Sequence, residues 1–453
     1  MHAGSDQEAQ SVTPPATIAF ADAFRFWLLL GFVSFGGPAG QIAIMHREIV
    51  ERRRWLSERR FLHALNYCMV LPGPEAQQLA TYIGWLMHRT LGGLVAGLLF
   101  VLPSLVLLVA LSWIYVEYGD VPLVAAVFAG IKPAVVAIVC FAAWRLGTRV
   151  IRNRAFALIA VAAFVAIAAF DVPFPLIVVA AGLVGWAAER AQSKWLVASE
   201  AHDATRSSCG PAVIDDDTPP PPHARPSVAR AFGIVGIAVT LWIGTLAAIA
   251  ATFGIAGTLF QMGWFFTKAA LVTFGGAYAV LPYVFQGAVD QHGWLTTAQM
   301  IDGLALGETT PGPLIMVVAF VGFLGAWADA ASMSLSPAAA GILGALCVTW
   351  FTFLPSFLFI FLGAPFVEAT RANLRLGATL GAITAAAVGV LLNLALLLAS
   401  HVLWPQGLAG GPSTMAAVIA LAAAIALFRF GVGIVPVVAA AAAVGFGLGL
   451  IGA

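Results

Sequence analysis

The sequence predicts an all-α integral membrane protein made of two inverted-topology repeats with broken or re-entrant helices. Hydrophobic types make up 61% of the 453 residues and charged types only 9%, against about 25% charged residues in a typical soluble domain. Apolar segments of bilayer-spanning length recur along the chain, and motifs of the first half return in the second half. So few charges cannot cover a water-facing surface, which excludes a secreted disulfide scaffold, a nucleic-acid-binding protein and a soluble enzyme.

About thirteen apolar segments follow one another, six before and seven after one long polar stretch. That stretch contains three consecutive aspartates and four consecutive prolines, a composition typical of a flexible linker. We therefore divide the chain into a first transmembrane repeat (1–188), a cytoplasmic linker (189–230) and a second transmembrane repeat (231–453). The segments lie near residues 24–45, 61–88, 91–115, 121–144, 155–170, 173–188, 231–253, 257–285, 298–326, 338–363, 376–400, 414–428 and 434–452.

Three motifs of the first half recur at one offset in the second half. Val33–Gly37, Trp55–Ser57 and Pro72–Pro74 match Val272–Gly276, Trp294–Thr296 and Pro311–Pro313, each 239 residues later. A fourth match, of Leu102–Ser104 with Leu354–Ser356, follows an insertion in the second half. Gap-free matches at one offset indicate a duplicated membrane unit.

An odd number of segments separates the two copies. The segment near 24–45 is the first, and its counterpart near 257–285 is the eighth. The second copy is therefore upside down if each other segment crosses the membrane once. Inverted repeats are typical of secondary transporters, which bind their substrate between the repeats near the bilayer midplane.

The basic residues help to choose between spanning and re-entrant segments. With a cytoplasmic N-terminus and thirteen crossings, the six arginines from Arg47 to Arg60 would lie outside, against the positive-inside rule. If segments one, two, eight and nine enter and return as hairpins, twenty of the 22 Lys and Arg become cytoplasmic and the C-terminus is external. Spanning but discontinuous helices remain the alternative, and both arrangements place the breaks near the midplane.

Glycine and proline interrupt the four segments that could form hairpins. A half-helix that begins at such a break directs free backbone N–H groups outward with a partial positive charge, which suits an anion. Kinks for close helix packing are the alternative for any single break. The candidate substrate-binding glycines are Gly36, Gly37 and Gly73 in the first half, and Gly275, Gly276 and Gly312 in the second.

Polar side chains cluster beside these breaks and could donate hydrogen bonds to the oxygens of an anion. Hydrogen bonding between helices is the alternative role for each of them. The candidates are Ser34, Asn66, Gln77, Gln78, Thr273, Thr309 and Thr310.

We single out four charged residues inside apolar segments, where a charge costs on the order of 3 kcal/mol. We expect Lys132 to neutralise the bound anion, although it could instead pair with a carboxylate. Glu75, Glu308 and Lys268 are candidates for a coupling site or an ion pair. Glu75 aligns with Leu314 and Glu308 with Met69, so the two halves have diverged and need not do the same job.

Several signatures of other functions are missing from the sequence. We find no Walker A motif, no HExxH or Cys/His cluster and no GxSxG motif, so we expect no cofactor, no metal and no catalytic residue. Transport by this chain would have to run on ion gradients or on the membrane potential.

Several runs together resemble the chromate ion transporter family in its long, two-repeat bacterial form. They are Phe35–Ala43, Trp55–Phe61, Leu71–Ala80 and Leu102–Ser104. The resemblance implies export of chromate through the bacterial inner (plasma) membrane, chromate resistance, and sulfate as a competing look-alike anion. The sequence departs from the first-half pattern at Ala277, where the first half has Pro38, and at Leu314, which leaves the second half's substrate contacts open.

Other functions remain open at this point. The transported anion could be sulfate or another oxyanion. An intramembrane enzyme acting on a phosphorylated lipid is less favoured, because no arginine lies deep in an apolar segment, and a scaffold subunit is less favoured still. The partners that we expect are chromate and the lipid bilayer, without nucleic acid, and a homo-oligomer is compatible with the sequence.

Overall fold

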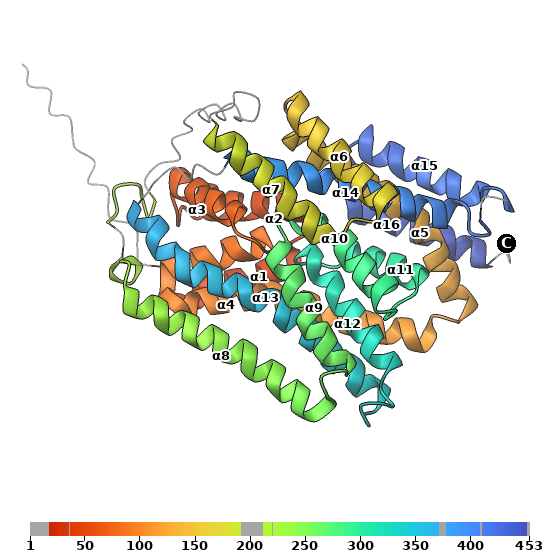
Figure 1. Ribbon diagram of the computed structural model, residues 1–453, viewed down its shortest axis with the longest axis horizontal. Coiled ribbons are helices and arrows are strands. Elements are labelled where there is room, and N and C mark those ends of the chain that lie inside the picture. The colour runs from red at the N-terminus through yellow and green to blue at the C-terminus, as the bar shows by residue number, and fades with distance from the viewer. Residues whose placement is uncertain are drawn as a thin grey trace, which may run out of the picture.

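The computed structural model describes residues 18–35, 37–191, 212–219, 221–370, 377–407 and 410–450. The regular elements within these ranges are helical (Figure 1). The expected all-α class is therefore correct for the described part of the chain. Gly36, the N-terminal tail and most of the linker lie outside the described residues.

The helices of the first half are short before the Pro-Gly-Pro break and longer after it. They are α1 (Phe20–Val33), α2 (Gly37–His46), the π-helix η1 (Arg47–Arg52), α3 (Glu58–Val70), α4 (Glu75–Tyr118), α5 (Pro122–Val150), α6 (Arg154–Phe170) and α7 (Phe174–Arg190). Helix α4 bends sharply at His88 and Arg89, whose backbone angles are not helical. Its first part, before the bend, is the counterpart of a short helix in the second half.

The second half repeats this order after η2 (Pro222–Ala224) and one additional helix, α8 (Val228–Phe253). Both π-helices, η1 and η3, occupy the same place in the two orders, 239 residues apart. The other elements are α9 (Thr258–Val272), α10 (Ala277–Phe285), η3 (Gln286–Gln291), α11 (Thr297–Thr309), η4 (Leu314–Met316), α12 (Val317–Ala328), α13 (Pro337–Thr370), α14 (Gly377–Leu403), α15 (Thr414–Phe428) and α16 (Ile434–Leu450). The repeat read from four short motifs thus extends to the order of the helices.

The predicted breaks divide helices where the sequence places them. Helix α1 ends before Ser34 and α9 before Thr273. Gly73 and Gly312 have φ angles of 126° and 103°. Residues other than glycine rarely adopt such positive φ angles. These glycines therefore let the chain turn between one short helix and the next.

Part of the polar linker packs against the first repeat. The N–H groups of Val213 and Ile214 donate to the carbonyls of Arg54 and Trp55 at 2.9 and 3.0 Å, and Ser57 N–H donates to the Ile214 carbonyl at 3.1 Å. The prediction of a flexible linker is therefore wrong for residues 212–219. These contacts place the arginine-rich loop at the same end of the molecule as residues 212–219 of the linker.

The second half's loops gather at the opposite end of α14. Near the start of α14, Thr379 donates a 3.0 Å hydrogen bond to Glu189, at the end of α7 that leads to the linker. Near its finish, Asp290 in η3 lies within electrostatic reach of both His401, on α14, and Asp171. A helix of 27 residues is about 40 Å long, so the two ends are separated by about the thickness of a membrane.

A buried charge group joins the repeats at the linker end. The Arg60 guanidinium on α3 lies 3.5 Å from the Glu368 carboxylate on α13, and Tyr82 donates a 2.6 Å hydrogen bond to Glu368. Arg60 is 8% exposed and Glu368 5% exposed. A buried pair with a further hydrogen bond holds two elements in one geometry, since breaking it would leave an uncompensated charge.

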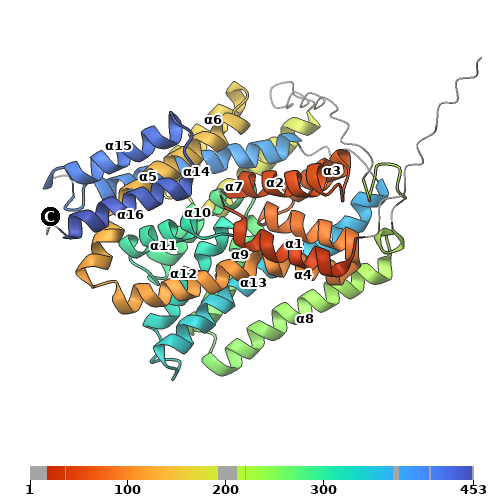
Figure 2. The same ribbon diagram turned by 180° about the vertical axis from the view of Figure 1, so that it is seen from behind.

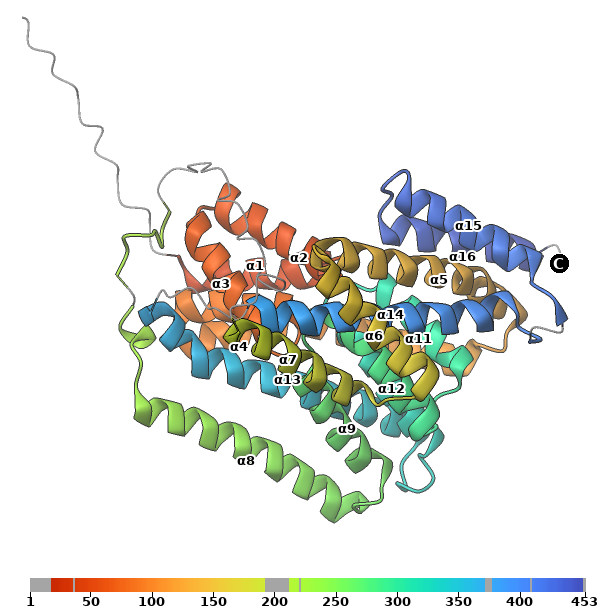
Figure 3. The same cartoon turned by 45° about the horizontal axis from the view of Figure 1, so that its top comes forward.

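Small residues bring the long helices of the two halves into close contact. In the packing of α5 on α16, Gly130 and Gly445 approach so closely that a methyl group on either would clash with the other's backbone. Gly185 of α7 packs on Ala378 and Ala382 of α14 in the equivalent contact. Figures 2 and 3 show these helices running side by side. Close backbone approach at small residues is the usual way in which membrane helices associate.

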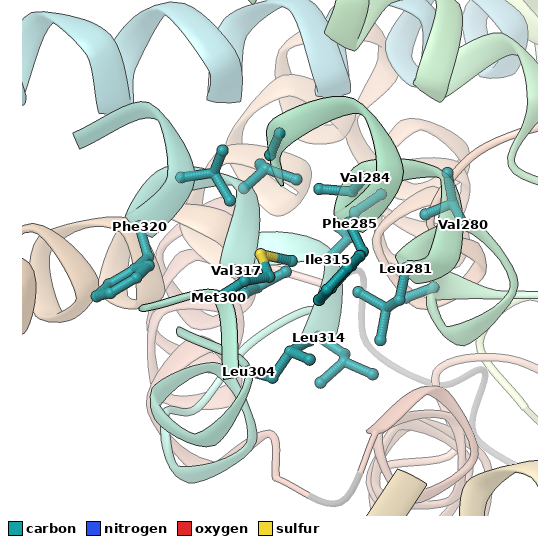
Figure 4. Close-up of a cluster of buried hydrophobic side chains, with 14 of the residues drawn as sticks. Val280, Leu281, Val284, Phe285, Met300, Leu304, Leu314, Ile315, Val317 and Phe320 are labelled. Carbon is teal, nitrogen blue, oxygen red and sulfur yellow. The ribbon is translucent and has the colours of Figure 1, made fainter. Parts of the chain in front are cut away.

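Apolar side chains of the short helices of the second half pack into one buried cluster. Val284 and Phe285 of α10, Met300 of α11, Ile315 of η4 and Phe320 of α12 pack around one another and are buried (Figure 4). In the described part of the chain, five helices (α4, α5, α8, α13 and α14) are long and apolar enough to cross a membrane. The expected thirteen segments are thus not confirmed as thirteen crossings, because the breaks divide four of them into shorter helices.

Candidate functional site

The breaks of the two repeats meet through a reciprocal pair of hydrogen bonds. Gly73 N–H donates to the Thr273 carbonyl at 2.7 Å, and Gly312 N–H donates to the Ser34 carbonyl at 2.8 Å. Gly73 and Gly312 are equivalent at the 239-residue offset, and so are Ser34 and Thr273. Each Pro-Gly-Pro break is therefore bound to the end of the helix before the other repeat's Gly-Gly break.

These two hydrogen bonds change one expectation from the sequence. Gly73 and Gly312 were expected to offer free N–H groups to an anion, but both N–H groups already have a carbonyl partner. The first-turn N–H groups of α2, α4 and α10 lack intrahelical partners in any α-helix. Those amides, rather than the two glycine amides, are the ones that can face a substrate.

The starts of α2, α4 and α10 converge on one place. A methyl group on Gly276, the residue before α10, would lie 3.9 Å from Glu75 Oε1 at the start of α4 and 3.9 Å from Pro38 Cγ in α2. A methyl group on Gly37 would lie 3.5 Å from the Tyr278 ring. Three helix N-termini with their partial positive charges therefore face a common region.

Three buried serine hydroxyls at the breaks have no hydrogen-bond partner. They belong to Ser34, Ser104 and Ser356, each at most 1% exposed. The Ser356 hydroxyl lies against Gly73, and the Ser104 side chain lies against Gly312. Buried hydroxyls are nearly always satisfied, so three orphans in one region indicate a place for an additional acceptor.

Ser104 and Ser356 were not among the predicted site residues. They belong to the Leu-Pro-Ser motif that recurs in both halves. That repetition was the available signal, but in the first half the motif lies about 30 residues after the Gly73 break and beyond the bend of α4. Only the packing of α4 and α13 across the repeats brings the two serines to the breaks.

Glutamine side chains also line the breaks. Gln41 Nε2 donates to the carbonyls of Gly312 and Ser34, Gln77 Nε2 donates to Thr81 Oγ1 at 3.0 Å, and Gln78 Nε2 donates to the Pro72 carbonyl at 2.8 Å. Their amide oxygens are buried without a partner. The sequence analysis named Gln77 and Gln78 correctly as residues beside a break, and it omitted Gln41.

The other predicted polar residues are placed less favourably for binding. The hydroxyls of Thr273, Thr309 and Thr310 donate to carbonyls of their own helices. Asn66 is exposed on the surface of α3, and Lys268 is exposed on α9, near His292. Neither Asn66 nor Lys268 lies among the residues that meet at the breaks.

The two predicted glutamates both lie at the centre. Glu75 faces Gly276, and the Tyr278 hydroxyl donates to Glu308 at 3.4 Å. Glu308 is 8% exposed. Because Tyr278 also lies beside Gly37, the two glutamates flank the region where the helix N-termini converge.

Lys132 pairs with a carboxylate that the sequence analysis did not name. Lys132 Nζ lies 3.3 Å from Asp302 Oδ2, and the Tyr115 hydroxyl donates to the same carboxylate at 2.9 Å. The alternative considered for Lys132, pairing with a carboxylate, is thus observed. Asp302 was missed because it lies 170 residues away, on α11.

Two arginines of α5 face the same region from the linker side. Arg149 lies within electrostatic reach of Glu75, and Arg145 lies within reach of Tyr278. They are one helical turn apart, and among the described residues neither guanidinium forms an ion pair. They add positive potential on the path from the linker side to the breaks.

Within the described residues, no cluster of His, Cys, Asp and Glu suits a metal ion.

Comparison with known proteins identifies the relatives of this arrangement. The family model described as Chromate transporter matches residues 21–186 and 260–446, one match in each half. The chain is 34% identical to the chromate transport protein of Pseudomonas aeruginosa, over 85% of this chain and 82% of the relative. It is 29% identical to the chromate transport protein of Cupriavidus metallidurans (87% and 86%) and 30% identical to a probable chromate transport protein of Synechococcus elongatus (88% and 88%). No solved structure matches the chain.

Proposed function

Because the chain belongs to the chromate transporter family, we propose that it exports chromate from the cytoplasm as a secondary transporter and so confers chromate resistance. The chain is a multi-pass membrane protein of a transporter family, not an enzyme. The lipid-directed enzyme considered above is therefore set aside. The membrane that we propose is the bacterial inner (plasma) membrane.

The meeting of the breaks is the observation that carries this proposal. The hydrogen bonds of Gly73 and Gly312 join the interruptions of both repeats, and the unpartnered hydroxyls of Ser34, Ser104 and Ser356 lie beside them. A tetrahedral dianion loses its hydration when it is buried and needs several well-aimed donors in exchange. Serine hydroxyls, first-turn amides and the Lys132 amine are donors of the required kind.

We propose that the two repeats have inverted topology around this site. In the first repeat, α1 and α2 form one hairpin, and α3 and the first part of α4 form another. Both hairpins open toward the end of the molecule where the linker lies. The equivalent hairpins of the second repeat open toward the opposite end of α14. With residues 1–188 and 231–453 as the repeats, the N-terminus and the linker would be cytoplasmic and the C-terminus external. The arginines of the loop Arg47–Arg60 then obey the positive-inside rule.

The candidate residues divide into donors and carboxylates. We assign anion binding to Ser34, Gln77, Gln78, Lys132 and the turns at Gly37, Gly275 and Gly276. Glu75 and Glu308 would compete with the substrate for the same positive region while ionised, so we count them as candidates for coupling or an ion pair and not as donors to the anion. Arg145 and Arg149 would attract the anion from the cytoplasm.

The membrane potential can supply the driving force. Moving one elementary charge through 100 mV is worth about 2.3 kcal/mol, so two charges are worth about 4.6 kcal/mol. An inside-negative potential drives chromate outward, and uniport alone sustains a concentration ratio of about three decades per 100 mV. A proton gradient can contribute without being required.

Uptake of labelled chromate into everted membrane vesicles tests the proposal. We expect chromate uptake that depends on the membrane potential. A fall in uptake when sulfate is added in excess would identify sulfate as a competing anion. Gly73→Leu and Lys132→Ala should each abolish uptake and cellular resistance while the protein remains in the membrane. Wild-type transport in both variants would remove the proposed site, and potential-independent uptake would remove the proposed energy source.

A further inference from the structure

Asp302, Lys132 and Tyr115 form a charge group between the repeats. Asp302 belongs to α11, whereas Lys132 and Tyr115 belong to α5 and α4. Oδ2 of Asp302 accepts from Tyr115 at 2.9 Å and faces Lys132 Nζ at 3.3 Å. The other oxygen, Oδ1, is buried and has no hydrogen-bond partner. The carboxylate is thus only partly satisfied, although its side chain is just 3% exposed.

The buried charge group at the linker end also combines a carboxylate, a tyrosine and a cation, but its cation is an arginine. There a carboxylate, Glu368, faces Arg60 and Tyr82. The Arg60 side chain is 8% exposed and has a planar guanidinium with donors in a fixed fork, whereas the Lys132 side chain is 30% exposed on a flexible stem. The Arg60 group is therefore suited to a fixed contact, and Lys132 is suited to exchange one anionic partner for another.

The repeat gives Lys132 a counterpart that lies beside a break. The 252-residue offset of the Leu-Pro-Ser motif pairs Lys132 with Thr384 in α14. The Thr384 side chain lies against Gly275, the first glycine of the second Gly-Gly break. We take Lys132 to hold the corresponding place on α5, from which its amine would turn toward an anion at the breaks.

We propose that Asp302 takes up a proton when Lys132 leaves it for the bound oxyanion. This inference rests on the proposed transport function. If Lys132 moved to the anion while Asp302 stayed ionised, a buried carboxylate would lose its only cation, which is strongly unfavourable. Protonation of Asp302 removes that charge. It also places an O–H group at Oδ1, the oxygen that has no hydrogen-bond partner in the structure. If that proton crosses the membrane with the dianion, one net negative charge moves in place of the two that uniport moves.

The surroundings of Asp302 contain few other groups that could take the proton. Lys132 is the facing charge on α5, and Tyr115, itself near Asp120, is the facing group on α4. The described parts of α12, α16 and η4 contain no titratable residue, and α14 contains only His401. Glu308, on α11 itself, bonds to Tyr278. Asp302 is therefore the carboxylate that competes with an anion for Lys132.

A proton-uptake measurement tests the inference on the full-length protein. Chromate is added to purified wild-type protein in weakly buffered detergent solution near pH 8, where chromate is a dianion, and proton uptake is followed by pH-stat. We expect uptake of up to about one proton for each anion bound, and an affinity that falls by up to about tenfold per pH unit on the alkaline side. In Asp302→Asn, the uptake and the pH dependence should disappear while chromate still binds.

Glu368→Gln is the matched control, because it removes a buried carboxylate with the same kinds of partners. It should retain the wild-type uptake per anion bound. Chromate binding to the wild type without proton uptake would overturn the inference even if Asp302→Asn failed to fold. Uptake that persists in Asp302→Asn but disappears in Glu75→Gln or Glu308→Gln would assign the proton elsewhere. Absence of chromate binding to the wild type would instead contradict the proposed function.

Discussion

Gly73 shows how a single residue fixes the geometry of a break. Its φ angle is 126°, and a methyl group there would lie 2.5 Å from the Ser356 hydroxyl. We expect Gly73→Ala to destabilise the protein by about 1–3 kcal/mol, because the backbone would be strained and Ser356 displaced. Thermal unfolding in detergent measures the change. Gly236→Ala is the control, since nothing lies near that position on α8, and it should be neutral or slightly stabilising. Equal effects of the two substitutions would contradict the explanation.

The orphan hydroxyls allow binding to be separated from folding. Ser356→Ala and Ser104→Ala remove no hydrogen bond within the protein, because neither hydroxyl has a partner. We expect an almost unchanged melting temperature and a chromate affinity weaker by about three- to tenfold, the worth of one hydrogen bond. Titration of purified protein with chromate gives the affinity.

Ser112→Ala, on the same helix as Ser104, is the control for these variants. Its hydroxyl donates to the Leu108 carbonyl, away from the breaks, and its removal should leave chromate affinity unchanged. If Ser112→Ala weakened binding as much as Ser104→Ala, the serines at the breaks would have no special role.

At the scale of elements, the contact between the linker and the loop after η1 can be tested covalently. Leu56 and Ile214 form an isolated parallel bridge, and paired residues at such a bridge are close enough for a disulfide. In a background with Cys68, Cys140, Cys209 and Cys347 replaced, we expect Leu56→Cys with Ile214→Cys to cross-link under mild oxidation. A mobility shift that DTT reverses reports the bond. No cross-link in the double variant would mean that residues 212–219 do not remain docked.

Short helices and their breaks follow from the sequence more readily than the contacts between them. The turns at Gly37, Gly73, Gly276 and Gly312 need residues without a side chain, so the sequence marks them. The pairing of Lys132 with Asp302 depends on how α5 and α11 pack, and no local pattern encodes that. The linker was misjudged because its charge and proline content argue for solvent exposure, whereas its backbone N–H groups are bound by the loop at Arg54 and Trp55.

For the whole molecule, the proposed inverted topology predicts opposite accessibility for equivalent loops. Arg53→Cys should react with a membrane-impermeant maleimide only after the cytoplasmic side is opened, and Gly293→Cys should react in intact cells. Nothing lies near the position of a side chain at Gly293, so a cysteine there would meet no neighbour, although the φ angle of 61° favours glycine and adds local backbone strain. Gly254→Cys, after α8, has open space as well and should behave like Gly293→Cys. Labelling of Gly293→Cys from the cytoplasm would contradict the inverted arrangement.

Helix α8 has a consequence for how such a chain could be divided. It has no counterpart among the paired elements, Leu246 is its one buried residue, and it follows one edge of the molecule (Figures 1 and 3). In the proposed inverted topology, α8 returns the chain to the far side of the membrane before α9 begins. Two separately translated halves, inserted in opposite orientations, would not need α8 as a connection. The contacts that hold the halves together are the hydrogen bonds of Gly73 and Gly312 and the close helix packing at glycines.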